Sequence, residues 1–240
     1  MQINAEQLSV RIGDHTVLHD VSLSFPALQI TAIIGRSGSG KSTLLRTING
    51  LVTPTSGRVL LDGRDFRIAQ AQAERLNMGY VVQGVGLFPH LTVEKNIAIA
   101  SRLIPVLFET EARVRELLER VGLPSHYRSK YPRELSGGEQ QRVGICRALF
   151  LDPPVLLMDE PFSALDPITR TELQQEVLRL QHARARTVVF ITHDMREAQK
   201  LADHVAVLEG GTVIQTGPAA EVIERPQHPV VRQLIEASLA

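Results

Sequence analysis

Short, largely apolar runs alternate with helix-length segments along most of the chain. Residues 30–34, Ile-Thr-Ala-Ile-Ile, have the nearly continuous apolar character of a strand that is buried on both faces. Similar runs follow at residues 78–82, 155–158, 187–191 and 205–208. Strands of this kind, separated by helices, are typical of a mainly parallel sheet covered by helices. The pattern therefore predicts an α/β fold.

Both ends of the chain predict elements of another kind. Near the N-terminus apolar and polar residues alternate, which predicts half-buried strands at the edge of a sheet. The apolar positions are Leu8, Val10 and Ile12, then Val21, Leu23 and Phe25. Near the other end, residues 209–212 (Glu-Gly-Gly-Thr) predict a hairpin, with helices after Pro218 and over residues 229–237.

The middle of the chain, residues 85–154, is dominated by charged stretches with helical periodicity. Residues 109–121 and 138–150 are the clearest, with breaks at Gly122 and near Pro132. We predict a single domain of 240 residues, in which residues 85–154 form a helical subdomain inserted into a core made of residues 1–84 and 155–240.

Charge and composition exclude several classes of protein. Lysine plus arginine, 26, balance aspartate plus glutamate, 26, so we expect no nucleic-acid partner. The longest stretch without these charged residues, 76–93, is broken by polar residues, proline and glycines, so no membrane span is expected. The N-terminus lacks a signal-peptide pattern, and the single cysteine, Cys146, allows no internal disulfide. Together these features predict a cytoplasmic protein.

A glycine-rich turn with a lysine follows the first predicted buried strand. Residues 35–43, Gly-Arg-Ser-Gly-Ser-Gly-Lys-Ser-Thr, match the phosphate-binding pattern G-x-x-x-x-G-K-[ST] before a helical run at residues 43–49. Its glycines let backbone N–H groups face phosphate, Lys41 can reach the β and γ phosphates, and the Ser42 hydroxyl can bind Mg²⁺. A purely structural turn would explain the glycines but not the lysine and hydroxyls. The predicted nucleotide-binding residues are Gly35, Ser37, Gly38, Ser39, Gly40, Lys41, Ser42 and Thr43.

Two acidic residues, Asp159 and Glu160, end the predicted strand at residues 155–158. Such a strand delivers carboxylates to the phosphate end of the sheet. Asp159 is then expected to hold magnesium, usually through water, and Glu160 to polarise the attacking water as general base. By itself the pair also fits a solvated strand end, and the phosphate-binding loop is what favours catalysis.

The most specific motif is the octet at residues 135–142, Leu-Ser-Gly-Gly-Glu-Gln-Gln-Arg, which precedes a helical run. Ser136 and the two following glycines, at a helix N-terminus, make a second anion site. Ser136 and Glu139 also make a capping box, and the two interpretations are compatible. On this octet the chain closely resembles the ABC ATPase family.

The resemblance implies a P-loop NTPase core with a mainly parallel sheet, an N-terminal antiparallel β-subdomain and the inserted helical subdomain. In the family the second anion site closes over ATP that is bound to the other copy, so the resemblance implies a homodimer formed on ATP binding. The residues expected to meet that ATP are Leu135, Ser136, Gly137, Gly138, Glu139 and Gln140.

Further pieces match in the family's order. The resemblance implies that Gln83 contacts Mg²⁺ and the lytic water, that Asp166 organises the subunit interface, and that His193 contacts the γ-phosphate. The catalytic set is then Glu160, His193 and Gln83, and the magnesium ligands are Ser42, Gln83 and Asp159.

One position departs from the family's pattern. Ile12, which completes the predicted nucleotide-binding set, stands where an aromatic residue usually stacks on adenine; an isoleucine can cover a ring face but offers no π surface. Two other residues receive no chemical role: His90 is interpreted as a loop or partner-contact residue, and Cys146 as a small buried core residue.

Residues 81–93 and 163–170 narrow the resemblance to the osmoprotectant branch of importers, which carry glycine betaine, choline and related quaternary amines. It implies an ATP-hydrolysing subunit, peripheral on the inner face of the cell membrane, that energises import through a separate transmembrane permease served by a solute-binding protein. Some members of the branch carry C-terminal nucleotide-sensing modules, which a chain ending at Ala240 is expected to lack. The alternatives are the ATPase subunit of another ABC importer or exporter, and a non-transport ABC ATPase acting in translation or DNA repair.

Overall fold

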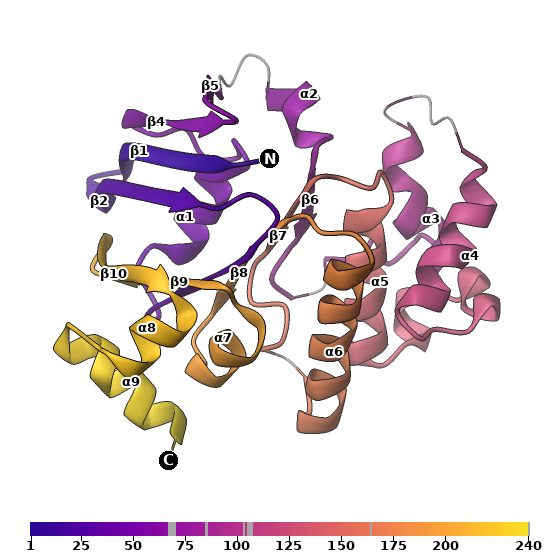
Figure 1. Ribbon diagram of the computed structural model, residues 1–240. Helices are drawn as coiled ribbons and strands as arrows, with labels where there is room; N and C mark the ends of the chain where they lie inside the picture. Colours follow the sequence, from indigo (N-terminus) through magenta and orange to yellow (C-terminus); the bar gives the residue numbers. More distant parts are fainter. Residues whose placement is uncertain (67–70, 85, 103, 105–107, 164, 240) are drawn as a thin grey trace. The chain divides into compact units, whose positions relative to one another are not determined.

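The structure is a computed structural model that describes residues 1–66, 71–84, 86–102, 104, 108–163 and 165–239 (Figure 1). Contacts group the chain into two compact units, each described by itself below. The first unit joins Met1–Arg75 to Arg186–Ala240, and the second unit is Leu76–Ala185. Val85, where the predicted helical subdomain begins, and Ala164, in the matched segment after Glu160, lie outside the described residues.

The first unit contains an antiparallel sheet, a second and mainly parallel sheet, and helices. Its elements are β1 (Ile3–Ile12), β2 (His15–Phe25), β3 (Ile30–Ile34), α1 (Lys41–Ile48), β4 (Ser56–Leu61), β5 (Arg64–Asp65), α2 (Ala71–Arg75), β8 (Thr187–Thr192), α7 (Met195–Leu201), β9 (His204–Glu209), β10 (Thr212–Pro218), α8 (Ala219–Glu224) and α9 (Pro229–Leu239).

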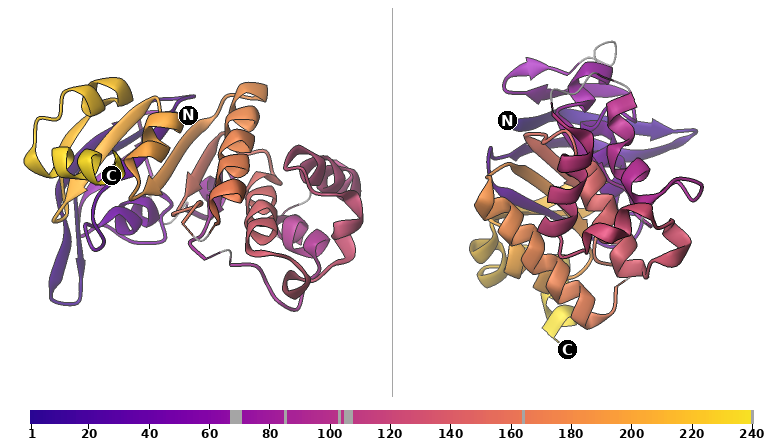
Figure 2. Two further views of the ribbon diagram at one scale, coloured as in Figure 1. Left: turned by 90° about the horizontal axis from the view of Figure 1, so that it is seen from below. Right: turned by 90° about the vertical axis from the view of Figure 1, so that its right-hand side faces the viewer.

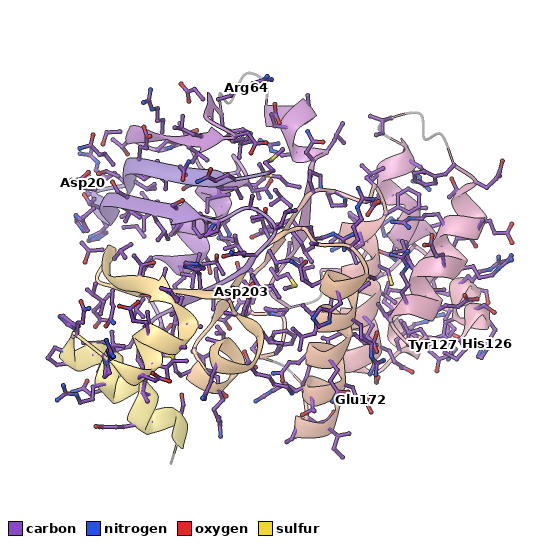
Figure 3. All side chains as sticks on the ribbon, in the orientation of Figure 1. Asp20, Arg64, His126, Tyr127, Glu172 and Asp203 are labelled. Carbon is purple, nitrogen blue, oxygen red and sulfur yellow. The ribbon has the colours of Figure 1, made fainter. Side chains whose placement is uncertain are left out.

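The antiparallel sheet has the strand order β2-β1-β4-β5. Inward residues of its strands, such as Leu8, Val10 and Leu18, are fully buried, which is why apolar and polar positions alternate here. In the second sheet β3 pairs in parallel with β8 and β9, and β9 pairs with β10 as an antiparallel hairpin. Asp203, labelled in Figure 3, ties the start of β9 to β3, because its Oδ2 accepts a hydrogen bond from the Ile30 N–H at 2.8 Å.

The second unit is mostly helical and contains one parallel pair, β6 with β7. Its elements are β6 (Met78–Val81), α3 (Val93–Ile97), η2 (Ala98–Arg102), α4 (Thr110–Arg120), η3 (Ser125–Ser129), η4 (Pro132–Glu134), α5 (Gly137–Leu149), β7 (Val155–Met158) and α6 (Pro167–Ala183). Helix α5 packs against β6 closely enough that a Cβ on Gly79 would lie 2.4 Å from the Ala148 carbonyl oxygen. Figure 2 shows α3, α4 and α5 gathered in the magenta and rose part of the chain.

The predicted elements are confirmed, and most bounds differ by only one residue. Two helices differ by two residues at one end. Helix α9 ends at Leu239 rather than at residue 237. Helix α1 begins at Lys41 rather than at residue 43, because Gly40 takes the N-cap position with a φ of 96°. The predicted α/β class and the antiparallel N-terminal strands are confirmed. The predicted division into a core and an inserted subdomain at residues 85–154 stays a prediction.

Candidate functional site

The loop between β3 and α1 has a backbone that only glycine fits at several points. Gly38 and Gly40 have φ values of 80° and 96°. A Cβ on Gly35 would lie 2.2 Å from the Leu208 carbonyl oxygen, and one on Gly40 would lie 2.7 Å from Leu18 Cδ2. Residues of β9 and β2 therefore leave no room for a side chain at these two glycines.

The start of helix α1 has the chemistry that an anion site requires. Its N-cap, Gly40, makes no side-chain capping bond, and no acidic residue stands in its first turn, within this fully described segment. First-turn N–H groups have no partner inside a helix, and the helix dipole attracts negative charge to them. Ser42 and Thr43 bring two half-buried hydroxyls to the same turn. The donors, the curl and the hydroxyls fit a phosphate chain with its cation.

Lys41 places its charge directly at this loop. The side chain is buried, and its Nζ donates hydrogen bonds to the carbonyl oxygens of Gly35 at 2.9 Å and Arg36 at 2.7 Å, with Ser39 Oγ at 3.4 Å. The ammonium therefore lies along the loop that precedes α1.

His193 lies in the same unit, one strand away. Because Ile34 of β3 pairs with Thr192 of β8 in parallel register, Gly35 and His193 both begin loops at the same edge of the sheet. The His193 side chain is exposed, whereas Thr192 before it is buried. Ile12 lies at the end of β1 beside Gly13, whose φ is 59°, and is 55% exposed. The roles predicted for His193 and Ile12 stay predictions.

In the second unit, the acids follow β7 as expected. All of Val155–Met158 is buried, Asp159 is fully buried, and its N–H donates to the Val81 carbonyl oxygen at 2.9 Å. Glu160 is half-buried and has a φ of 48°, a left-handed backbone that costs a residue with a side chain roughly 1–2 kcal/mol. Glu160 therefore stands at a turn directly after β7.

Gln83 and Glu160 meet in this unit. Gln83 Nε2 donates a hydrogen bond to Glu160 Oε2 at 3.2 Å. Gln83 follows β6 and Glu160 follows β7, and these strands are paired in parallel, so the pairing brings together two of the three predicted catalytic residues. Of the expected magnesium ligands, Gln83 and Asp159 belong to the second unit and Ser42 to the first.

The octet starts α5 through the predicted capping box. Ser136 Oγ accepts from the Glu139 N–H at 3.3 Å, and Glu139 Oε2 accepts from the Ser136 N–H at 2.7 Å. Tyr127, labelled in Figure 3, donates its hydroxyl to Glu139 Oε1 at 2.9 Å. Burial raises the pKa of Glu139, but the hydrogen bonds from Ser136 and Tyr127, with the Lys130 charge, hold this pKa below its ordinary value.

Around the cap, the remaining octet residues are fixed by packing. Leu135 is buried, and its carbonyl oxygen accepts from Gln140 Nε2 at 3.1 Å. A Cβ on Gly138 would lie 2.3 Å from Thr169 Cγ2 of α6, whereas one on Gly137 would meet nothing within 4 Å. Ser136 and Gly137 are exposed, so the start of the helix faces outward.

Asp166 is the N-cap of α6. Its Oδ1 accepts from the N–H groups of Ile168 and Thr169, both at 3.1 Å. Hydrogen bonds from Thr169, first from its side chain and then from its backbone, lower the pKa of Asp166. Capping accounts for this aspartate locally, and its interface role stays a prediction.

Two further residues support segments of the site, although neither belongs to a sequence motif named above. Asn96 is fully buried: its Oδ1 accepts from the Phe88 N–H at 2.7 Å, and its Nδ2 donates to the carbonyl oxygens of Phe88, Leu91 and Thr92 at 3.0–3.1 Å. Phe88, whose backbone these hydrogen bonds hold, is 43% exposed. Tyr127 is the second such residue. Asn96 contacts residues four to eight positions earlier and Tyr127 contacts a residue twelve positions later, and hydrophobic periodicity does not signal such polar contacts.

The structure agrees with the interpretation of His90 as a loop residue and of Cys146 as a buried core residue. His90 is exposed and stands edge-on to Phe88, with ring centroids 6.1 Å apart. Cys146 is fully buried, its thiol donates to the Leu117 carbonyl oxygen at 3.3 Å, and burial raises its pKa.

A model of the ABC transporter family matches residues 18–163. The chain belongs to this family. Among curated proteins, it is 42% identical to the glycine betaine/carnitine/choline transport ATP-binding protein OpuCA of Bacillus subtilis, over 97% of this chain and 62% of that protein. It is 43% identical to the glycine betaine uptake system ATP-binding protein YehX of Escherichia coli, over 98% of this chain and 77% of that protein.

Solved structures agree with the family. The dimeric structure of MJ0796, a bacterial ABC transporter cassette, has a TM-score of 0.82 and 30% identity, with 90% of this chain and 98% of that chain covered. The same values hold for its post-hydrolysis dimer bound to ADP and Pi. The cbiO1 structure from Clostridium perfringens has a TM-score of 0.84 and 30% identity, over 97% of this chain and 93% of that chain. None of the helices that the structure describes is long and apolar enough to cross a membrane.

Proposed function

We propose that this chain binds and hydrolyses ATP as the ATPase subunit of an importer for osmoprotectants of the quaternary-amine class. The main observation that supports ATP hydrolysis is the hydrogen bond between Gln83 and Glu160. It lies next to the fully buried Asp159, which follows β7. The solute class rests on the relatives, which are named for glycine betaine, carnitine and choline transport.

The phosphates of ATP are bound by the P-loop. The N–H groups of the first turn of α1 face the β and γ phosphates, and the Lys41 ammonium can exchange its contacts with the Gly35 and Arg36 carbonyls for phosphate oxygens. Mg²⁺, when bound, neutralises charge on the β and γ phosphates. Ser42, Gln83 and Asp159 are the residues that would hold it.

Glu160 is the general base. Its carboxylate accepts a proton from the attacking water or orients that water, while Gln83 fixes the position of Oε2 through the 3.2 Å hydrogen bond. His193, exposed at the end of β8, contacts the γ-phosphate. Ile12 covers the adenine by apolar contact.

Two copies of the chain close over two ATP molecules. Ser136 and the Gly137-Gly138 backbone of one copy, at an outward-facing helix start, meet the phosphates held by Lys41 of the other copy. Asp166 lies at this interface. The dimeric cassette structures, 30% identical to this chain, support such an arrangement.

The dimer drives a membrane protein that it contacts. The loop from Gln83 to His90 links the catalytic glutamine to an exposed Phe88, and we assign it to contact with a transmembrane permease. The chain is then cytoplasmic and peripheral on the inner face of the membrane, with a solute-binding protein delivering the solute. An exporter subunit, another importer, or an ATPase of translation or DNA repair would share the nucleotide site. Co-purification with a polytopic permease, rather than with ribosomes or DNA, separates these classes.

The Glu160→Gln variant tests the proposed chemistry. The amide keeps the shape and the contact with Gln83 but cannot take a proton, so ATP binding is retained and turnover falls by a factor of about 100 or more. Lys41→Ala is the matched control and is expected to lose ATP binding. Wild-type turnover in Glu160→Gln would refute Glu160 as the base.

A further inference from the structure

The C-terminal helix α9 packs against α7 through one side (Figure 1). The positions on that side recur with helical spacing: Val231 is fully buried, Leu234 and Ile235 are half-buried, and Ser238 is 9% exposed. Three of these side chains are apolar. Ser238 is the polar exception, so its hydroxyl requires a specific partner.

That partner is the first N–H of α7. Met195 N donates to Ser238 Oγ at 3.1 Å in a buried hydrogen bond. The N-cap of α7, Asp194, accepts instead from the N–H of Arg196, at 2.8 Å. The Met195 N–H has no acceptor in its own helix, as is usual for a first turn. Ser238 supplies one from a distant part of the chain, and its own hydroxyl donates to Leu234 O at 3.0 Å, which fixes its direction.

Ser238 therefore fixes one side of the segment that carries His193. The other side is fixed by Thr192, whose Oγ1 accepts from the Asp194 N–H at 3.0 Å and donates to the buried Glu197 carboxylate at 2.5 Å. His193 stands between these two attachments with an exposed side chain. The backbone just after His193 is therefore held by two buried or half-buried hydroxyls.

The same helix also reaches the P-loop. Arg36 Nη2 donates to Gln233 Oε1 at 2.7 Å. Both side chains are exposed, so water competes for this contact and it holds the loop weakly. The buried Ser238 contact is the stronger of the two attachments.

We propose that Ser238 is a positioning residue for ATP hydrolysis, which holds the start of α7 so that His193 faces the γ-phosphate. This inference rests on the function proposed above for His193. A purely structural Ser238 would dock α9 and change stability, but it would leave the catalytic step of the folded protein unchanged.

The test compares steady-state ATP hydrolysis by full-length variants. Ser238→Ala is expected to lower kcat about fivefold to tenfold and to leave KM for ATP within about twofold, since a displaced histidine affects the transition state more than ground-state binding. Ser238→Thr keeps the hydroxyl and is expected to restore kcat. Ser238→Cys keeps the size but accepts hydrogen bonds poorly, so it is expected to behave like Ser238→Ala. Glu236→Ala, on an exposed position of the same helix, is the control.

A double-mutant cycle with His193→Ala separates the two hypotheses. In the His193→Ala background, Ser238→Ala is expected to change kcat by less than about twofold, because the group that it positions is gone. If His193→Ala alone leaves kcat unchanged, the function assigned to His193 is wrong. If His193→Ala lowers kcat but Ser238→Ala and Ser238→Cys do not, or if Ser238→Ala lowers it equally in both backgrounds, Ser238 is not a positioning residue.

Discussion

Gly137 and Gly138 are neighbours in sequence but have different surroundings. A Cβ on Gly138 would lie 2.3 Å from Thr169 Cγ2, and Thr169 is a β-branched residue with few χ1 rotamers open to it in a helix. Gly138→Ala is expected to lower the free energy of unfolding by about 1–3 kcal/mol, the usual cost of overpacking. Gly137→Ala, with open space around it, is expected to change it by less than about 1 kcal/mol. Urea unfolding measures both.

A second substitution checks this explanation. Thr169→Ser removes the methyl group that the new Cβ would meet, so Gly138→Ala/Thr169→Ser is expected to recover most of the lost stability. Equal losses for the two glycine variants, or no recovery in the double variant, would contradict it.

At the scale of elements, the capping box of α5 makes stability depend on pH. The pKa of Glu139 is lowered in the folded protein, so its contribution is complete above the unfolded-state pKa and is lost as the pH falls through the folded-state pKa. Glu139→Gln is therefore expected to be less stable than the wild type by about 0.3–1 kcal/mol at neutral pH.

Unfolding of both proteins from about pH 7 to pH 3 measures this difference, which is expected to vanish at the acid end. Tyr127→Phe removes the hydroxyl that donates to Glu139 Oε1 and is expected to reduce the same difference. A difference that is constant over the whole pH range would show that the charge of Glu139 does not support the helix.

The loop before α3 depends on one amide. Asn96 Nδ2 faces the carbonyl oxygens of Phe88, Leu91 and Thr92. Asn96→Asp puts an acceptor against acceptors in a fully buried position, and it is expected to cost about 2–4 kcal/mol in the free energy of unfolding.

Thermal unfolding measures this cost. Asn4→Asp is the matched control, because the side-chain oxygen of Asn4 accepts a hydrogen bond from Gln2 in an exposed contact, and an aspartate oxygen can accept the same bond. That change is expected to cost less than about 0.5 kcal/mol. Equal effects of the two substitutions would mean that Asn96 does not organise the loop.

The elements of this fold follow from local pattern, whereas the contacts that complete the site do not. The largely apolar strand Ile30–Ile34 and the capping box at Ser136 each depend on residues within a few positions, so the sequence predicts them closely. Ser238 acts on Met195, and Asn96 on Phe88, through packing between separate elements. Serine in a helix and asparagine beside a loop are too common to signal such roles.

At the scale of the whole molecule, the proposed ATP site is shared between two copies, and this sharing can be tested by complementation. Lys41→Ala removes the P-loop cation, and Ser136→Arg fills the exposed start of α5 with a bulky charge. In the Glu160→Gln background, which prevents hydrolysis, each variant alone is expected to sediment with ATP as a single chain. A mixture of the two can build one intact site, from Lys41 of the Ser136→Arg copy and Ser136 of the Lys41→Ala copy. Sedimentation of the mixture is therefore expected to show a species of twice the mass that requires ATP and is absent from either variant alone. If each site used Lys41 and Ser136 of one chain, neither copy could supply an intact site and the mixture would stay at the mass of one chain.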